Sequence, residues 1–155
     1  MKKKIQRNYL EINSLVDLKD SKNFPEGYLV ELVYPFNFQL NKFFYKNVGK
    51  KHHWIDRLIW TEKQWTEYVS SEKIKTYILK KNEDLAGYYE LIIHDDKKEV
   101  EIAYLGLLEE YQNKKLGSYL LSSAIKNSFM SNHNRVWVHT CSLDHKNALT
   151  NYTAR

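Results

Sequence analysis

The sequence has a single cysteine, Cys141, in 155 residues, so an internal disulfide is excluded. One thiol fits a reducing compartment, and we expect the protein in the cytoplasm. No apolar run approaches the roughly 18 residues that a membrane-spanning helix needs, so we expect no membrane partner. The basic start, MKKKIQRNYLEI, is not followed by the apolar core of a secretory signal peptide.

Internal repeats, low-complexity tracts and linkers rich in Pro, Gly or Ser are also missing from the chain. Hydrophobic residues make up 43% and charged residues 28% of the sequence, which is ordinary for a folded soluble domain. A chain of this length can bury a substantial core. We therefore expect one domain over residues 1–155.

The net charge of +5, from 24 Lys and Arg against 19 Asp and Glu, is distributed along the chain. Clustered basic residues would neutralise phosphates and indicate a nucleic-acid partner. Here the lysines alternate with acidic residues, so we interpret them as solvated surface and expect no nucleic-acid partner. A basic patch for a smaller anionic ligand fits the same pattern.

Hydrophobic periodicity predicts both helices and strands. Helices are expected over 36–49, over 61–71 behind the capping-box pair Thr61 and Gln64, over 114–129, and over 144–154 behind Asp144. Strands are expected at 27–35, 74–81, 82–96, 97–108 and 135–141, and residues 8–15 open the fold as a strand or a strand–helix start. The three segments over 74–108 form an antiparallel meander, and helix, strand and helix follow. This order predicts an α/β (α+β) domain with a central, mixed and mostly antiparallel sheet flanked by helices.

Residues 110–125, EYQNKKLGSYLLSSAI, join the last strand of the meander to the next helix. Unpaired N–H groups and the dipole at a helix N-terminus favour an anion. Lys114 and Lys115 add positive charge, and Gly117 allows a ligand to approach the backbone closely. Gln112 can order the loop. The pattern predicts a phosphate or pyrophosphate site, with simple packing as the other reason for a glycine here.

Two segments resemble the acetyl-CoA signature of the GNAT superfamily of N-acyltransferases. EIAYLGLLEEYQNKKLGSYLLSSAI, residues 101–125, is similar to the family's strand, glycine loop and amphipathic helix, and RVWVHTCSLDHKNALTNYTAR, residues 135–155, to the strand and tyrosine helix that follow. The resemblance marks 74–155 as the acetyl-CoA-binding core and leaves 1–73 as the acceptor-side half. It implies a GNAT-like fold and transfer of acetyl from acetyl-CoA to a primary amine of a small molecule or peptide.

The resemblance also implies catalytic roles. A primary amine is protonated at neutral pH, so its attack on a thioester needs a base. Glu101 matches the family's base, with Glu90 as the next candidate, and a surface glutamate on an alternating strand is the other interpretation of Glu101. Tyr152 matches the general acid that protonates the departing thiolate, with a packing tyrosine as the alternative.

Contacts to acetyl-CoA are implied in the same way. Leu105, Gly106 and Leu107 match the bulged strand whose backbone binds the pantetheine arm and polarises the thioester carbonyl. Gly106 suits such a bulge, or it relieves crowding in the core. Asn147 matches the asparagine that hydrogen-bonds the pantetheine arm. The pyrophosphate is expected over the loop formed by Gln112, Asn113, Lys114, Lys115, Leu116, Gly117 and Ser118.

The sequence departs from the family pattern in two places. Lys115 stands where the loop has its first glycine, so its side chain compensates by pairing with the pyrophosphate, or affinity is reduced. The closing strands that follow the tyrosine helix are missing after Arg155, which leaves the strand at 135–141 beside an incomplete sheet. We expect a second chain or an N-terminal segment to cover this edge, and we favour a homodimer.

The six histidines form no metal motif, because no two are four residues apart and no cysteine pair accompanies them. We therefore expect no metal. Two other classes of function compete with an enzyme. One is a catalytically silent GNAT-like domain that binds CoA as a sensor or scaffold, and the other is a basic nucleic-acid-binding module.

Overall fold

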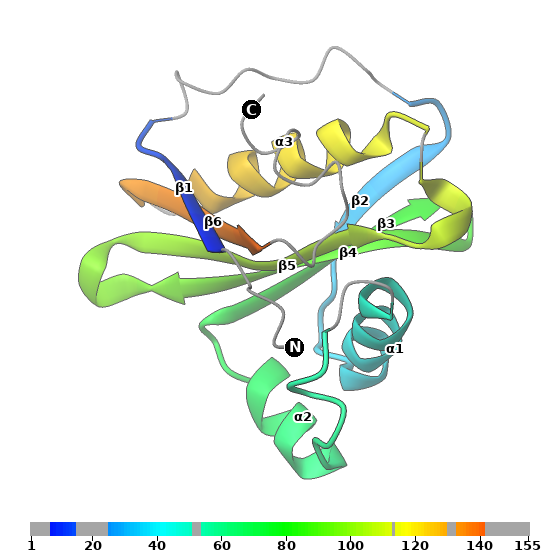
Figure 1. Ribbon diagram of the computed structural model, residues 1–155, viewed down its shortest axis with the longest axis horizontal. Coiled ribbons are helices and arrows are strands. Elements are labelled where there is room, and N and C mark those ends of the chain that lie inside the picture. Colours follow the sequence, from blue (N-terminus) through cyan, green and yellow to red (C-terminus); the bar gives the residue numbers. More distant parts are fainter. Residues whose placement is uncertain (1–6, 15–24, 51–53, 113, 130–132, 142–155) are drawn as a thin grey trace, which may run out of the picture.

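The computed structural model describes residues 7–14, 25–50, 54–112, 114–129 and 133–141 (Figure 1). The strands are β1 (Arg7–Ile12), β2 (Tyr28–Leu32), β3 (Ile74–Lys81), β4 (Asp84–His94), β5 (Glu99–Leu107) and β6 (Arg135–Cys141). The α-helices are α1 (Phe38–Gly49), α2 (Glu62–Val69) and α3 (Leu116–Ser128). Short 3-10 turns, η2 (Asp95–Lys97) and η3 (Glu109–Tyr111), follow β4 and β5. The predicted final helix over 144–154 lies outside the described residues.

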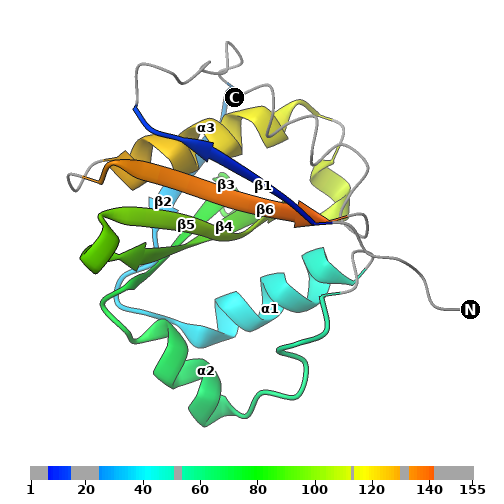
Figure 2. The ribbon, with the colours of Figure 1, turned by 60° about the vertical axis from the view of Figure 1, so that its left-hand side comes forward.

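All six strands form one sheet in the order β1-β6-β5-β4-β3-β2. Neighbouring strands are antiparallel except β5 and β6, which are parallel. Helix α3 covers one face of the sheet, and α1 and α2 cover the other (Figures 1 and 2). We call these the α3 face and the α1–α2 face. The predicted class, a mixed and mostly antiparallel sheet flanked by helices, is confirmed.

The outer side of β6 is covered by β1, which pairs with it from Arg7↔Cys141 to Ile12↔Val136. A bare edge at β6 was the reason to expect a homodimer. The structure shows the alternative, because an N-terminal segment of the same chain occupies that edge. The homodimer therefore no longer follows from this part of the sheet.

The larger core lies between α3 and the sheet. Leu116, Leu120, Leu121 and Ile125 recur at helical spacing and pack against buried strand residues such as Leu91 and Val100. These α3 side chains are almost entirely removed from water. Burying each leucine contributes roughly 1.5–3 kcal/mol, so this helix is held mainly by its apolar side. Its N-terminus is thereby fixed at the end of β5.

A second core lies on the α1–α2 face and is rich in aromatic rings. Phe44 of α1 stacks on Tyr88 of β4 with ring centroids 4.8 Å apart. Trp65 of α2 packs edge-on against Tyr45 of α1. The predicted capping box starts α2, since the Gln64 amide donates to the Thr61 hydroxyl and the Thr61 amide donates to the Gln64 side chain. The N-terminal half of the chain therefore forms a lobe fastened to the sheet by aromatic packing.

None of the helices in the described residues is both long and apolar enough to span a membrane.

Candidate active site

The parallel strands β5 and β6 separate part-way along their length. Their ladder runs only from Glu99↔Arg135 through Val100↔Val136 to Glu101↔Trp137. Strand β5 continues to Leu107 and β6 to Cys141, and these further residues form no ladder with each other. The sheet therefore opens directly after Glu101, and one backbone edge of β5 is left unpaired within the described part of the chain.

A bulge in β5 lies at this opening. Leu91 of β4 pairs with Ile102, but the preceding Glu90 pairs with Tyr104, so Ala103 is an extra residue on β5. A β-bulge bends its strand and increases the local twist, which turns β5 away from β6. The predicted bulge at Leu105–Leu107 is wrong in position, because those three residues pair regularly with residues 87–89.

Gly106 has a packing role instead. A Cβ atom built at this position would collide with Val48 Cγ1 of α1. The Trp54 ring also lies 3.9 Å from that position. Gly106 therefore lets α1 approach β5 closely, which is the second of the two interpretations that the sequence left open.

The loop after β5 is ordered by side-chain contacts. Gln112 Nε2 donates to the Leu107 carbonyl oxygen over 3.3 Å, which ties the loop to the end of the strand. Lys114 Nζ lies 5.6 Å from the centroid of the Tyr111 ring, within cation–π range. Gln112 orders this loop as predicted, and Lys114 and Lys115 are both exposed at its end.

The N-terminus of α3 directly follows these lysines. Lys115 is the N-cap, with φ 61° and ψ 20°, in the left-handed region. No side chain of the described residues caps the helix, and no acidic residue lies in its first turn. The Ser118 hydroxyl donates to the Lys115 carbonyl oxygen rather than to an incoming ligand. First-turn N–H groups next to two exposed lysines make a site suited to an anion.

The left-handed backbone at Lys115 explains why glycine is favoured at this position in the family pattern. Glycine reaches positive φ without steric cost, whereas a residue with a Cβ pays roughly 1–2 kcal/mol for it. Here a lysine adopts this left-handed backbone, which places its side chain at the N-terminus of α3.

Glu101 occupies the point where β5 and β6 separate. Its neighbours Val100 and Ile102 point into the α3 core, so its own side chain lies on the α1–α2 face. The Glu101 side chain is 16% exposed, and Oε1 lies 3.3 Å from Nε2 of His94. A carboxylate with partial access to solvent therefore lies beside the opening in the sheet.

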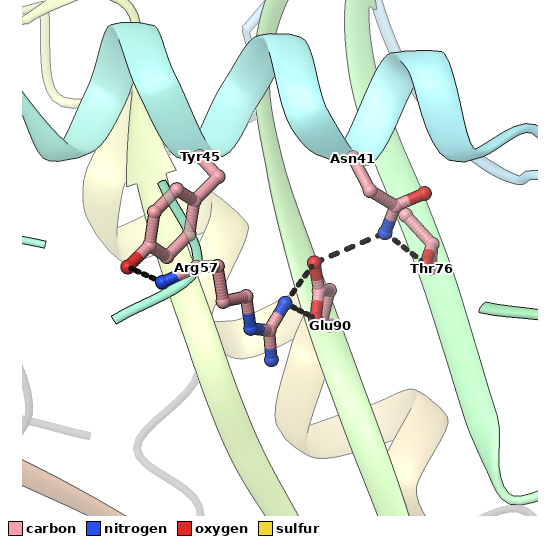
Figure 3. Close-up of polar contacts among 5 residues, drawn as sticks. All are labelled: Asn41, Tyr45, Arg57, Thr76 and Glu90. Carbon is pink, nitrogen blue, oxygen red and sulfur yellow. Dashed lines mark hydrogen bonds and ion pairs between the residues drawn. The ribbon is translucent and has the colours of Figure 1, made fainter. Parts of the chain in front are cut away.

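Glu90, the second candidate base, lies on the same face in a different environment (Figure 3). Its side chain is fully buried, and Arg57 Nη1 lies 2.9 Å from Oε1 and 3.3 Å from Oε2. Asn41 Nδ2 donates to Oε2 over 3.0 Å and also to the hydroxyl of Thr76. Both oxygens of Glu90 are therefore engaged by α1 and by the segment between α1 and α2.

Arg57 lies among aromatic rings, and the sequence analysis did not identify it. The guanidinium carbon is 4.1 Å from the centroid of the Tyr68 ring and 4.4 Å from that of Tyr104. Burial lowers the pKa of Arg57, but the Glu90 carboxylate and the nearby Tyr68 and Tyr104 hydroxyl groups together outweigh it, and the pKa is raised. The signal for this residue was an arginine next to the apolar and aromatic residues of the segment WIDRLIW, residues 54–60.

Comparison with known proteins now decides the family. The sequence model described as the Acetyltransferase (GNAT) family matches residues 34–154. This chain belongs to the GNAT family. A search of the curated proteins finds no match to it.

Solved GNAT structures share the fold at low sequence identity. A GCN5-related N-acetyltransferase from Sphaerobacter thermophilus superposes with a TM-score of 0.68 and 14% identity, over 95% of this chain and 46% of that one. A GCN5-related N-acetyltransferase from Kribbella flavida gives 0.62 and 13%, over 88% and 50%. An aminoglycoside acetyltransferase from an uncultured soil metagenomic sample gives 0.68 and 11%, over 83% and 86%. This chain thus spans about half the length of the first two proteins.

Several residues that the GNAT resemblance implies lie outside the described residues. They are Asn113 of the loop, Asn147 and Tyr152. Of the remaining predicted residues, Glu90 lies on β4, and Glu101 and Leu105–Leu107 lie on β5. Gln112, Lys114 and Lys115 lie in the segment between β5 and α3, and Leu116, Gly117 and Ser118 form the start of α3. Within the described ranges, no group of three or more His, Cys, Asp or Glu side chains is arranged to hold a metal ion.

Proposed function

We propose that this GNAT protein is an N-acetyltransferase that transfers the acetyl group of acetyl-CoA to a primary amine, with Glu101 as general base. The observation that carries the proposal is the position of Glu101 in the last β5–β6 pair before the two strands separate. An acyl donor that enters between the separated strands would bring its thioester next to this carboxylate. Glu101 is also partly exposed, so an amine can reach it.

Glu101 suits the role of base better than Glu90. A base must be free to accept a proton at an atom that the substrate can reach. Both oxygens of Glu90 already accept hydrogen bonds, and its side chain is fully buried. Protonating it would also leave the buried Arg57 guanidinium without its counter-charge, which is costly. We assign Glu90 a structural role, in which it fastens α1 and the segment between α1 and α2 to the sheet.

The reaction we propose is direct attack. Glu101 removes a proton from the ammonium form of the acceptor, and the amine nitrogen attacks the thioester carbonyl carbon. The resulting oxyanion needs preorganised N–H donors. The Leu108 N–H donates to β4, so by alternation the Gly106 N–H also faces β4, and the N–H groups of Leu105 and Leu107 face the unpaired edge of β5 and offer these donors. Collapse breaks the carbon–sulfur bond, and the thiolate takes a proton from Tyr152. The nitrogen still carries one surplus proton after the attack, and its loss, through water, returns a proton to the tyrosinate. Asn147 would hold the pantetheine arm.

The pyrophosphate of acetyl-CoA is proposed to bind at the N-terminus of α3. The fit rests on the absence of acidic residues in the first turn, the left-handed Lys115 and the exposed lysines beside it. Anions are stabilised at helix N-termini by about 0.3–1 kcal/mol from the dipole alone, and lysine charges add to this. Replacing Gly117 with Val should remove this binding, because a β-branched side chain would lie beside the first-turn N–H groups.

The acceptor is proposed to be a small-molecule or peptide amine that binds on the α1–α2 face. The solved structure similar to this chain that is named as an aminoglycoside acetyltransferase supports an amine acceptor. In this chain, aromatic rings and carboxylates share that face, and both attract cations. A protonated amine is thus compatible with the surface around Glu101.

Two measurements test the proposal. Thermal denaturation with acetyl-CoA, CoA and a short oligonucleotide separates the classes of function, because ligand at 100 times its Kd adds about 2.7 kcal/mol of stability. Release of the CoA thiol with a panel of amines then tests for turnover. Binding of acetyl-CoA without turnover on any amine would favour a silent CoA-binding domain, and stabilisation by the oligonucleotide alone would favour a nucleic-acid-binding module.

Variants locate the chemistry. Glu101→Gln and Tyr152→Phe should retain acetyl-CoA binding while turnover falls by about 10²–10⁴-fold, as expected for loss of a general base or acid. The control is Glu99→Gln, which changes a carboxylate two positions away on the same strand. Turnover of Glu101→Gln equal to that of wild type would remove Glu101 from the mechanism.

A further inference from the structure

The partner of Glu101 is a histidine on the neighbouring strand. His94 ends β4, and its Nε2 atom lies 3.3 Å from Glu101 Oε1. Strand register places His94 opposite Glu99 and Glu101 opposite Ile92, so the contact is a diagonal one between antiparallel strands. The His94 side chain is 36% exposed and the Glu101 side chain 16%, so the imidazole is the partner with more access to water.

A tryptophan of β6 lies beside the imidazole. The rings of His94 and Trp137 are nearly parallel, with an interplanar angle of 13° and centroids 6.2 Å apart. Trp137 is also the residue paired with Glu101 in the last step of the β5–β6 ladder. Three adjacent strands thus present His94, Glu101 and Trp137 together on the α1–α2 face, at the opening of the sheet.

We propose that His94 is the proton outlet of the Glu101 base. This role rests on the proposed function. After Glu101 has taken a proton from the ammonium group of the acceptor, Nε2 of the neutral imidazole accepts that proton from the carboxyl group. The imidazolium releases the proton on Nδ1 to water, and exchange with water restores the starting tautomer. One proton passes from the amine to solvent, and the carboxylate is ready for the next acceptor.

The chemistry of the two groups suits this order. An imidazole nitrogen is in general a stronger base than a carboxylate oxygen, so it can take the proton from the carboxyl group. An imidazole exchanges protons with water readily near neutral pH. A carboxyl group that is mostly removed from solvent therefore gains a route for its proton through a more exposed neighbour.

Charged groups of both signs lie on the segments that adjoin His94. The turn after β4 carries Asp95, Asp96, Lys97 and Lys98, and β5 carries Glu99 and Glu101. Lys73 directly precedes β3, which pairs with β4, and Arg135 of β6 is paired with Glu99 and Glu11. The carboxylate in contact with the imidazole is that of Glu101, which therefore stands beside any positive charge that forms on the ring.

Chemical rescue tests the outlet. His94→Ala removes the ring and should lower kcat by about 10- to 100-fold with little change in the KM for acetyl-CoA. Imidazole added to the assay should restore turnover in proportion to its concentration. Pyrazole, a ring of the same size and a weaker base, should not. A residue that only shapes the site would show no such dependence on buffer base.

The control variant is His133→Gln. His133 lies near the same turn, 3.7 Å from Asp95, but it contacts the Ser128 carbonyl oxygen rather than Glu101. It should keep the pH profile of wild type. Thermal denaturation and acetyl-CoA binding show whether His94→Ala is folded. If it is not folded, His94→Gln replaces it in the assay. With His94→Gln, a low kcat that added imidazole restores supports the outlet, and a kcat equal to that of wild type overturns it.

The outcomes separate this proposal from the proposed function. If Glu101→Gln is slow but His94→Ala turns over like wild type, the outlet is wrong and the base stands. A slow His94→Ala that imidazole does not rescue also overturns the outlet. If Glu101→Gln turns over like wild type, the assignment of the base fails first.

Discussion

Tyr88 and Tyr89 are consecutive residues of β4 and both side chains are fully buried, yet their hydroxyl groups differ in hydrogen bonding. The Tyr89 hydroxyl accepts from Asn127 Nδ2 over 2.6 Å and lies 3.0 Å from the Ser123 hydroxyl. The Tyr88 hydroxyl, on the other face of the sheet, has no hydrogen-bond partner among the described residues. The two positions therefore form a matched pair.

Removing each hydroxyl should have different consequences for stability. Tyr89→Phe removes one hydrogen-bond partner from each of the partly buried side chains Asn127 and Ser123, and should lower the free energy of unfolding by about 1–2 kcal/mol. Tyr88→Phe removes an unpaired polar atom and should change it by less than about 0.5 kcal/mol, or raise it. Urea denaturation of both variants measures the difference. Equal losses would mean that the Tyr88 hydroxyl has an unrecognised partner.

The left-handed Lys115 predicts a stabilising substitution. Lys115→Gly removes the steric cost of positive φ, roughly 1–2 kcal/mol, but adds freedom to the unfolded chain. We expect a net gain of about 0.5–1 kcal/mol in the free energy of unfolding. Lys114→Gly is the control, because the structure records no left-handed backbone there, and it should be neutral or destabilising. A loss of stability in Lys115→Gly would show that the side chain contributes more than its backbone costs.

The buried Glu90–Arg57 pair predicts strong coupling. Glu90→Gln leaves the buried Arg57 guanidinium without a counter-charge, and Arg57→Met leaves the buried Glu90 carboxylate without one. Each variant should lower the free energy of unfolding by about 3–5 kcal/mol. The double variant should lose much less than the sum of the two. Lys80 and Glu31, 3.4 Å apart on the surface, give the control pair, whose disruption should cost below about 1 kcal/mol. A double-mutant cycle with no coupling energy would contradict the geometry in Figure 3.

Buried tyrosines predict a loss of stability in alkali. Burial raises the pKa of Tyr77, Tyr88, Tyr89 and Tyr104, the last to about 12. An unfolded tyrosine has a pKa near 10, so the folded chain binds more protons above that pH. The stability is therefore fully present below about pH 10 and falls as the pH rises through the folded values.

The measurement is urea denaturation at pH values of about 8, 9.5 and 10.5. The wild type should lose stability over this series. Tyr104→Phe should reduce the slope, whereas Tyr34→Phe, at a side chain that is 88% exposed, should leave it unchanged. A wild type with constant stability up to about pH 11 would contradict the burial of these hydroxyl groups.

Local chemistry was sufficient to predict much of the fold. The capping box at Thr61 and Gln64 involves groups three residues apart, so its pattern is visible in the sequence. The apolar positions of α3 follow helical spacing for the same reason. The loop before α3 was predicted because both its charge and its place between strand and helix are local features.

The remaining features depend on residues far apart in the chain. Ala103 is a bulge only relative to its partner strand β4, and no residue type in β5 marks the position. Glu90 was the next candidate base because it lies on the strand beside that of Glu101, but its ion pair is made with Arg57, 33 positions away. His94 was not singled out, because its link to Glu101 depends on how β4 and β5 are aligned.

The pairing of β1 with β6 has a consequence for the order in which the protein is made. Glu11 and Arg135 form an ion pair across these strands and are 124 positions apart in the chain. At roughly 5–20 residues per second, a ribosome needs about 6–25 s to deliver the second after the first. The β2–β3 pair and the β3–β4 hairpin join nearer segments and can form during that interval. Strand β1 is therefore translated before the other five strands of this sheet yet is among the last to enter it, and until β6 is made its backbone groups can pair with another nascent chain.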